Sequence, residues 1–166
     1  MRIYSFPPIA DSHSKVLILG TMPGRESLVQ QQYYAHPRNA FWRIMLSLCR
    51  VPFTTDYEQR YTTILRHNIA VWDVLQSCER KGSADSAIIN EYPNDLGSFL
   101  DNHTSLQCII CNGKTAARLF RRYYSHCTDM PVIQAPSTSP AYAQCSYEEK
   151  LRQWHMLFTQ CTDILL

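Results

Sequence analysis

The sequence predicts an α/β fold, a three-layer α/β/α sandwich with a central, mainly parallel four-stranded sheet. Two observations predict it: short apolar runs rich in β-branched residues indicate strands, and helical patterns separate these runs along the chain. An apolar share of 45% over 166 residues is enough for one buried core, so we expect a single domain over residues 1–166. The predicted strands are Val16–Leu19, Ile69–Trp72, Leu106–Cys111 and Val132–Gln134.

Helices are indicated by apolar side chains at helical spacing between and after these strands. The last helix is the clearest, because Ser146 and Glu149 form a capping box ahead of an apolar stripe that runs from Tyr147 to Cys161. No internal repeat or linker interrupts the alternation of strands and helices. The other predicted helices are Asn39–Arg50, Asp56–His67, Asn94–Leu100 and Lys114–Tyr124.

Charge and cysteine content restrict the function classes. The net charge of +2 excludes a strongly basic field over the whole surface, so binding of a polyanion would rest on a local patch or on backbone N–H groups. Seven cysteines, several inside apolar runs, predict reduced buried thiols rather than a complete disulfide framework. Cys108 and Cys111 lie on one predicted strand with alternating side chains, and we expect no metal site there or elsewhere.

Membrane segments are not indicated. The N-terminal stretch lacks the continuous apolar run of a signal peptide, and no segment reaches the length of a membrane span. We therefore expect a cytoplasmic protein with no membrane partner.

Turn-forming and polar segments follow all of the predicted strands. Because the carboxyl ends of parallel strands meet at one edge of a sheet, these segments predict a ligand site at that edge. A Gly-x-x-Pro-Gly turn alone is ordinary after a strand, so the convergence of the segments carries the prediction. They are Gly20–Gly24, Asp73, Asn112–Lys114 and Pro136–Pro140.

A polar cluster of His36, Arg38 and Asn39 lies directly before the aromatic pair Phe41 and Trp42. Hydrogen-bonding groups beside aromatic rings suit recognition of a flat ligand such as a nucleobase. The predicted site therefore has a candidate ligand class.

The segments that carry these features resemble the uracil-DNA glycosylase superfamily, and within it the hypoxanthine-DNA glycosylase branch. They are Gly20–Gly24, Tyr34–Trp42 and Pro136–Ala141, and the resemblance extends from about Val16 to the final helix. It implies a monofunctional enzyme of base excision repair that flips a deaminated base, hypoxanthine first and uracil second, out of DNA. Hydrolysis of the N-glycosidic bond would leave an abasic site. The resemblance implies no metal or organic cofactor and DNA containing a deaminated base as the partner, and we expect a monomer.

One departure from the family pattern decides the catalytic candidates. Mismatch-specific relatives hold the water with the Asn of Gly-x-Asn-Pro-Gly, but Met22 stands at that position here. The resemblance to the hypoxanthine branch therefore assigns catalysis to Asn39, whose amide would orient water or bind the base. The residues alone leave a helix N-cap open for Asn39. Asp73 is the second candidate, as a carboxylate that activates water or balances a sugar cation, and its alternative is a cap or turn acceptor.

Two further groups of residues are candidates for binding. Tyr34 matches the aromatic that stacks on the flipped base in the relatives, although a half-buried loop aromatic is the simpler interpretation, and His36 also suits a turn. The base-binding candidates are Thr21, Met22, Tyr34, His36 and Asn112. The candidates for gripping the DNA backbone or wedging into the duplex are Gly24, Lys114, Ser137, Thr138, Ser139, Pro140 and Tyr142.

Two other functions remain open at the level of sequence. Loss of the first-motif Asn, with Met22 in its place, is compatible with a noncatalytic nucleic-acid binding module. A small hydrolase of free nucleosides or nucleotides would use the serine-containing loop to bind one phosphate.

Overall fold

Four parallel strands form the centre of the fold, in the order β3-β2-β6-β7. The computed structural model describes residues 1–161, so residues 162–166 of the expected single domain lie outside the described part. Every strand predicted from the sequence is present, and the predicted fold class is confirmed. The strands are β2 (Val16–Gly20), β3 (Ile69–Asp73), β6 (Cys108–Asn112) and β7 (Val132–Ala135).

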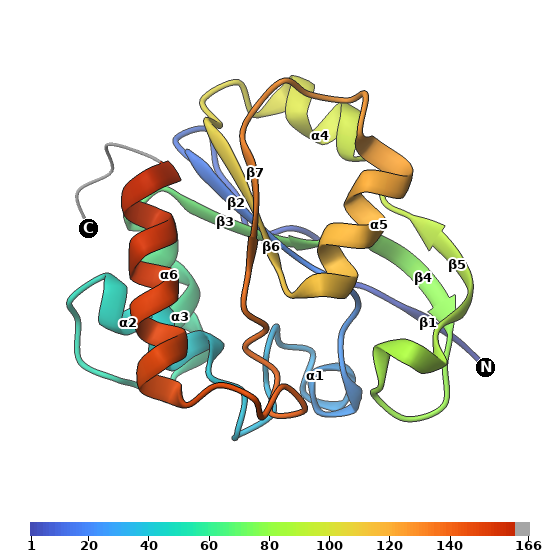
Figure 1. Cartoon of the computed structure of the whole chain (residues 1–166), viewed down its shortest axis with the longest axis horizontal. Helices are drawn as coiled ribbons and strands as arrows, with labels where there is room; N and C mark the ends of the chain where they lie inside the picture. Colours follow the sequence, from blue (N-terminus) through green and yellow to red (C-terminus); the bar gives the residue numbers. More distant parts are fainter. Residues whose placement is uncertain (162–166) are drawn as a thin grey trace.

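Helices cover both faces of this sheet, with α2, α3 and α6 on one side and α4 and α5 on the other (Figure 1). Each helix predicted from the sequence is present, and α1 and the short 3-10 helix η1 are additional. Ser146 Oγ accepts from the Glu149 N–H at 3.2 Å, but the Glu149 carboxylate bonds Arg152 instead of closing the capping box. The helices are α1 (Arg25–Gln30), α2 (Phe41–Leu48), α3 (Tyr57–Arg66), η1 (Asp85–Ala87), α4 (Leu96–Asn102), α5 (Lys114–Tyr124) and α6 (Tyr147–Cys161).

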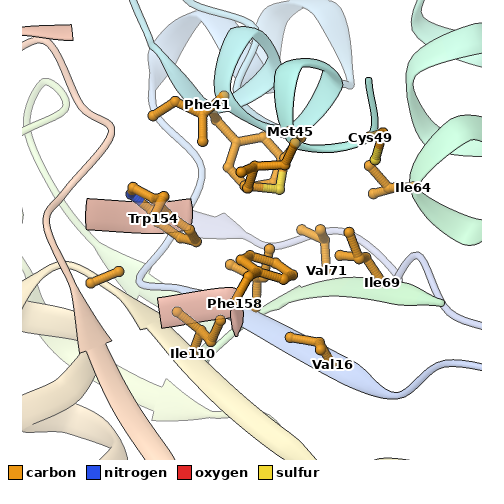
Figure 2. Packing of buried hydrophobic residues seen from close by; sticks show 14 of the residues in the cluster. Val16, Phe41, Met45, Cys49, Ile64, Ile69, Val71, Ile110, Trp154 and Phe158 are labelled. Atoms are coloured by element: carbon orange, nitrogen blue, oxygen red, sulfur yellow. The ribbon is translucent and has the colours of Figure 1, made fainter. Parts of the chain in front are cut away.

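The core is divided by the sheet into two hydrophobic clusters. Alternate side chains of β2, β3 and β6 enter opposite clusters, so Val16 and Ile18 face α2 and α6 while Leu17 and Leu19 face α4 and α5. Figure 2 shows Trp154 and Phe158 of α6 in the first cluster, between α2 and the strands. Burial on both faces explains why these strands have continuous apolar sequences.

A second, antiparallel sheet was not predicted. It has the order β1-β4-β5, with β1 (Arg2–Tyr4), β4 (Leu75–Glu79) and β5 (Ile89–Pro93). β1 and β5 have no fully buried residue. Strands that are not buried do not need continuous apolar sequences, so no strand signal is present in their sequences. β4 begins directly after the end of β3, and it carries the following loop, residues 80–88, to the carboxyl edge of the parallel sheet.

The cysteines differ in part from the expectation. Cys108 of β6 and Cys161 of α6 are joined by a disulfide, with their Cα atoms 5.9 Å apart, and the other cysteines within residues 1–161 are free. The partners are 53 residues apart in sequence and meet because α6 packs on the sheet. Within residues 1–161, no helix has the length and apolar character needed to cross a bilayer.

Candidate active site

A cavity of about 680 Å³ opens at the carboxyl edge of the parallel sheet, where β2, β3 and β6 end. α1 and the loop that follows β7 lie at this same end of the sheet (Figure 1). Every site candidate predicted from the sequence lines the cavity, and their roles stay predictions. They are Thr21, Met22, Gly24, Tyr34, His36, Asn39, Asp73, Asn112, Lys114, Ser137, Thr138, Ser139, Pro140 and Tyr142.

Asp73 is the buried carboxyl group of the cavity. Its side chain is almost inaccessible, with 4% of the residue exposed, and Ser5 Oγ donates to Oδ2 at 2.6 Å. Burial raises the pKa of Asp73 to about 7, the charge of Asp85 adds to the rise, and Ser5 and Arg80 oppose it. Near neutral pH both protonation states are therefore populated, and the group can accept or donate a proton.

Gly20 allows Asp73 and Tyr34 to approach the end of β2. Gly20 and Asp73 are paired across β2 and β3, and a Cβ at Gly20 would lie 2.5 Å from Asp73 Oδ1 and 2.9 Å from Tyr34 Oη. Any larger residue at this position would displace one of the two side chains. The glycine of the first motif is thus required by packing against the site.

Tyr34 is held in an uncommon conformation, with φ of 54°, in the left-handed region. Its ring stacks on Phe41 with centroids 3.8 Å apart, and its Oη is buried without a hydrogen-bond partner among residues 1–161. Burial raises the pKa of Tyr34, and the charge of Asp73 raises it further, so the hydroxyl keeps its proton. A buried donor on a cavity wall is costly unless a ligand accepts from it.

The oxygen and the nitrogen of the Asn39 side-chain amide have different surroundings. Its Oδ1 accepts from the Phe41 N–H at 2.9 Å, in a turn directly before α2, whose N-cap position is Ala40. Its Nδ2 has no hydrogen-bond partner among the described residues, and Asn39 lines the cavity. One amide can therefore support the helix and still offer two N–H donors to a ligand.

Thr138 holds the two sides of the site together. Its N–H donates to Asn112 Oδ1 and its Oγ1 accepts from Asn112 Nδ2, both at 3.0 Å, and its carbonyl accepts from the Ala40 N–H at 3.0 Å. The residue is 1% exposed. A buried residue with its polar atoms engaged supports the site from below its surface, and the DNA contact of Thr138 stays a prediction. Asn112 uses both its Oδ1 and its Nδ2 in these hydrogen bonds with Thr138.

The serine loop, Pro136–Ala141, is supported by α6. Trp154 Nε1 donates to the Pro136 carbonyl at 3.0 Å, and Lys150 Nζ donates to the Ser139 carbonyl at 3.2 Å. On its other side the loop touches Gly113, where a Cβ would lie 3.0 Å from the Ser137 Cβ. The loop is therefore a fixed wall of the cavity.

The sequence gave no indication of Arg80, which holds the loop of residues 80–86 over the cavity. Its guanidinium is fully buried, donates to the carbonyls of Gly82 and Pro23, and lies 3.9 Å from Asp85. Ser83 of this loop accepts from the Arg25 N–H at the start of α1. An arginine after a half-buried strand has no sequence signal for burial, because the Pro23 carbonyl that it reaches lies 57 residues away. The Ser5 contact to Asp73 was missed for the same reason.

His36 behaves as a turn residue, since its Nδ1 accepts from the Arg38 N–H at 3.1 Å. Met22 is 8% exposed and belongs to the hydrophobic cluster beneath α5. A thioether there offers no strong hydrogen bond to a water molecule, in keeping with the departure seen in the first motif.

The model of the family described as the uracil DNA glycosylase superfamily matches residues 7–158. The chain belongs to this superfamily. A solution NMR structure of a candidate uracil DNA glycosylase from Methanosarcina acetivorans shares the fold, with a TM-score of 0.80 and 30% identity over 97% of this chain and 99% of that one.

Two curated relatives, from Methanosarcina barkeri and Methanosarcina acetivorans, carry the name hypoxanthine DNA glycosylase. They are 35% and 36% identical to the chain over 115 and 112 residues. The matched regions cover 69% and 67% of this chain and 73% and 71% of the relatives. The protein is a DNA glycosylase.

Thr138→Val tests the central hydrogen bonds of the glycosylase. The substitution preserves shape but leaves the Asn112 amide without its acceptor, and we expect the free energy of unfolding to fall by about 1–3 kcal/mol in urea denaturation. Thr138→Ser keeps the hydroxyl and should lose less. Thr159→Val, at an exposed position of α6, serves as the control and should change stability by about 0.5 kcal/mol or less. Equal losses in the Val and Ser variants would contradict the assignment.

Asp73→Asn tests the cost of the buried carboxyl group. The pKa of Asp73 is raised from 3.8 to about 7 on folding, so the native state binds more protons than the unfolded state between these values. Stability of the wild type should therefore fall as pH rises through this window, by about 1.4 kcal/mol per pH unit for a full proton, and level off above it. Urea denaturation at several pH values should show Asp73→Asn gaining on the wild type as pH rises. A constant difference across this range would refute the raised pKa.

Proposed function

We propose that the glycosylase removes a deaminated base from DNA, hypoxanthine first and uracil second, and leaves an abasic site. The observation that carries this proposal is a single cavity that joins Asn39, whose Nδ2 has no partner among the described residues, with the protonatable Asp73 carboxyl group. The names of the two Methanosarcina relatives support hypoxanthine as the first substrate.

The chemistry requires groups of opposite character. Cleavage of the N-glycosidic bond builds positive charge on the sugar and negative charge on the departing base. In the proposed mechanism the Asp73 carboxylate stabilises the sugar cation and accepts the proton of the attacking water. Asn39 Nδ2 donates a hydrogen bond to the departing base, and the buried Tyr34 hydroxyl provides a second donor on the cavity wall. The proposal uses no metal or organic cofactor, and a flipped base is what brings the bond into the cavity.

Grip on the DNA backbone is assigned to the rim. Lys114 is exposed at the start of α5, where the first backbone N–H groups of the helix point toward the opening. Ser137 and Ser139 are partly exposed on the serine loop, and small hydroxyls there let a phosphate approach closely. Pro140 and Tyr142, on the same rim, are the proposed wedges into the duplex.

The cellular setting is part of the same proposal. We infer a monomeric, single-domain enzyme that acts in the cytoplasm. Its rim must stay open to a long polymer, and five cysteines remain free thiols beside the one disulfide, Cys108–Cys161, within residues 1–161.

The substrate is tested by single-turnover base release from duplexes that carry one deoxyinosine, one deoxyuridine or no lesion, with alkaline cleavage to reveal abasic sites. We expect the fastest release from deoxyinosine, slower release from deoxyuridine and none from the undamaged duplex. Cleavage of free deoxyinosine at the same rate would indicate a nucleoside hydrolase. Binding of all duplexes without release would indicate a noncatalytic module.

Asn39→Asp separates the two tasks of the amide. The carboxylate keeps the oxygen that accepts from the Phe41 N–H but removes the N–H donors, so folding should be preserved while base release slows by about 100-fold or more. Asn39→Ala removes both groups and should add a loss of stability of about 1 kcal/mol. Release rates are compared with thermal melting of each variant. An Asp variant as active as the wild type would exclude the amide from catalysis.

A further inference from the structure

Lys150 is a buried cation without a countercharge. Only 5% of the residue is exposed, and none of the ion pairs within residues 1–161 includes it. Burial lowers its pKa, and its Nζ makes one hydrogen bond, to the Ser139 carbonyl, beside the Tyr142 ring at 5.4 Å. An ammonium group has three donors, and lysine is rarely this buried unless an anion compensates it.

A second, smaller cavity of about 240 Å³ adjoins this lysine. Arg38 and Arg43 line it together with Lys150, and no aspartate or glutamate does. Neither arginine forms an ion pair within the described residues. Glu149, the neighbour of Lys150 in the chain, is already engaged with Arg152 at 2.6 Å. Among the described residues, the charged side chains that line the smaller cavity are therefore all positive.

Stacking on Tyr147 orders the Arg43 side chain at the smaller cavity. Its guanidinium lies over the Tyr147 ring, 3.8 Å from the centroid, so the side chain is ordered although Arg43 is exposed. A stacked guanidinium keeps its N–H edge free for a planar or tetrahedral oxyanion, and a nearby ammonium adds a point charge. This combination suits a phosphate group.

The two cavities are neighbours that share one wall, because Asn39, Pro140 and Tyr142 line both of them. A DNA strand whose flipped nucleotide enters the larger cavity can run along this wall. We propose that the smaller cavity binds a backbone phosphate of that strand, adjacent to the flipped nucleotide, through Arg38, Arg43 and Lys150. The inference rests on the proposed function, since the strand places the phosphate.

Binding there has a consequence for the serine loop. Lys150 touches the Ser139 carbonyl and lines the phosphate cavity, so an anion that engages its remaining donors holds the lysine against the loop. The phosphate cavity thus couples the DNA backbone to the wall that carries Pro140. Neighbouring phosphates bound at the serine loop and in this cavity would bracket the flipped nucleotide.

The test combines one protein variant with one change in the DNA. Arg43→Gln removes a charge from the phosphate cavity, and Arg66→Gln is the matched control, because Arg66 is an exposed helical arginine just before β3, at the opposite edge of the sheet. Each protein is titrated with a deoxyinosine duplex at several salt concentrations. The duplexes carry either natural phosphates or a neutral methylphosphonate at single positions flanking the lesion, and base release is measured in parallel.

We expect Arg43→Gln to bind about tenfold more weakly and to lose about 0.9 from the slope of log K against log salt, while Arg66→Gln matches the wild type. One methylphosphonate position should weaken the wild type by a similar factor and leave Arg43→Gln unaffected. Lys150→Met should show the same salt slope as Arg43→Gln, and circular dichroism checks that it folds.

The outcomes separate the two proposals. If the wild type releases hypoxanthine while Arg43→Gln and Arg66→Gln bind alike at every salt concentration, the phosphate cavity is wrong and the proposed function stands. If every methylphosphonate weakens Arg43→Gln as much as the wild type, Arg43 contacts no phosphate. A wild type that neither binds nor cleaves any lesion duplex would overturn both.

Discussion

The site depends on the hydrogen bonds of Thr138. Three polar atoms of this buried residue join the end of β6, through Asn112, to the start of α2, through Ala40. The serine loop is thereby tied to the segment that presents Asn39, although the two are about a hundred residues apart in the chain. Asn39, which we propose as the catalytic amide, needs a fixed position, and this buried polar network provides it.

The buried Asp73 carboxyl group lowers the stability of the folded protein at the carboxyl edge of the parallel sheet. A carboxyl group with a pKa of about 7 destabilises the folded protein whenever it ionises, yet that pKa is what gives it both proton states near neutrality. Gly20 has no side chain that would push Asp73 aside, and Ser5 gives it one hydrogen bond. The arrangement exchanges stability for reactivity in the proposed mechanism.

The three-stranded antiparallel sheet carries the loop that covers one side of the cavity. β4 continues from the end of β3, and Arg80 at its far end bonds back to Pro23 in the first motif. The loop between β4 and β5 therefore covers one side of the cavity, opposite the serine loop and α6. In our proposals, this cover encloses the base, while the cations of the α2 and α6 side hold the backbone.

The parallel strands, their flanking helices and the edge that carries the site were all determined by local sequence. Apolar runs and helical periodicity depend only on near neighbours, so Val16–Leu19 and the stripe of α6 were readable. Most site candidates were also readable, because they follow a parallel strand, whereas Tyr34, His36 and Asn39 were indicated by the polar cluster before Phe41 and by the family resemblance. Tertiary structure alone decided that Thr138 is buried, that Asn39 shares its amide between a turn and the cavity, and that Arg80 and Ser5 reach the site. It alone brought Lys150 beside Arg38 and Arg43. The physical reason is that burial, pKa and countercharge depend on contacts between residues far apart in the chain, and such contacts leave no periodic signal in the sequence.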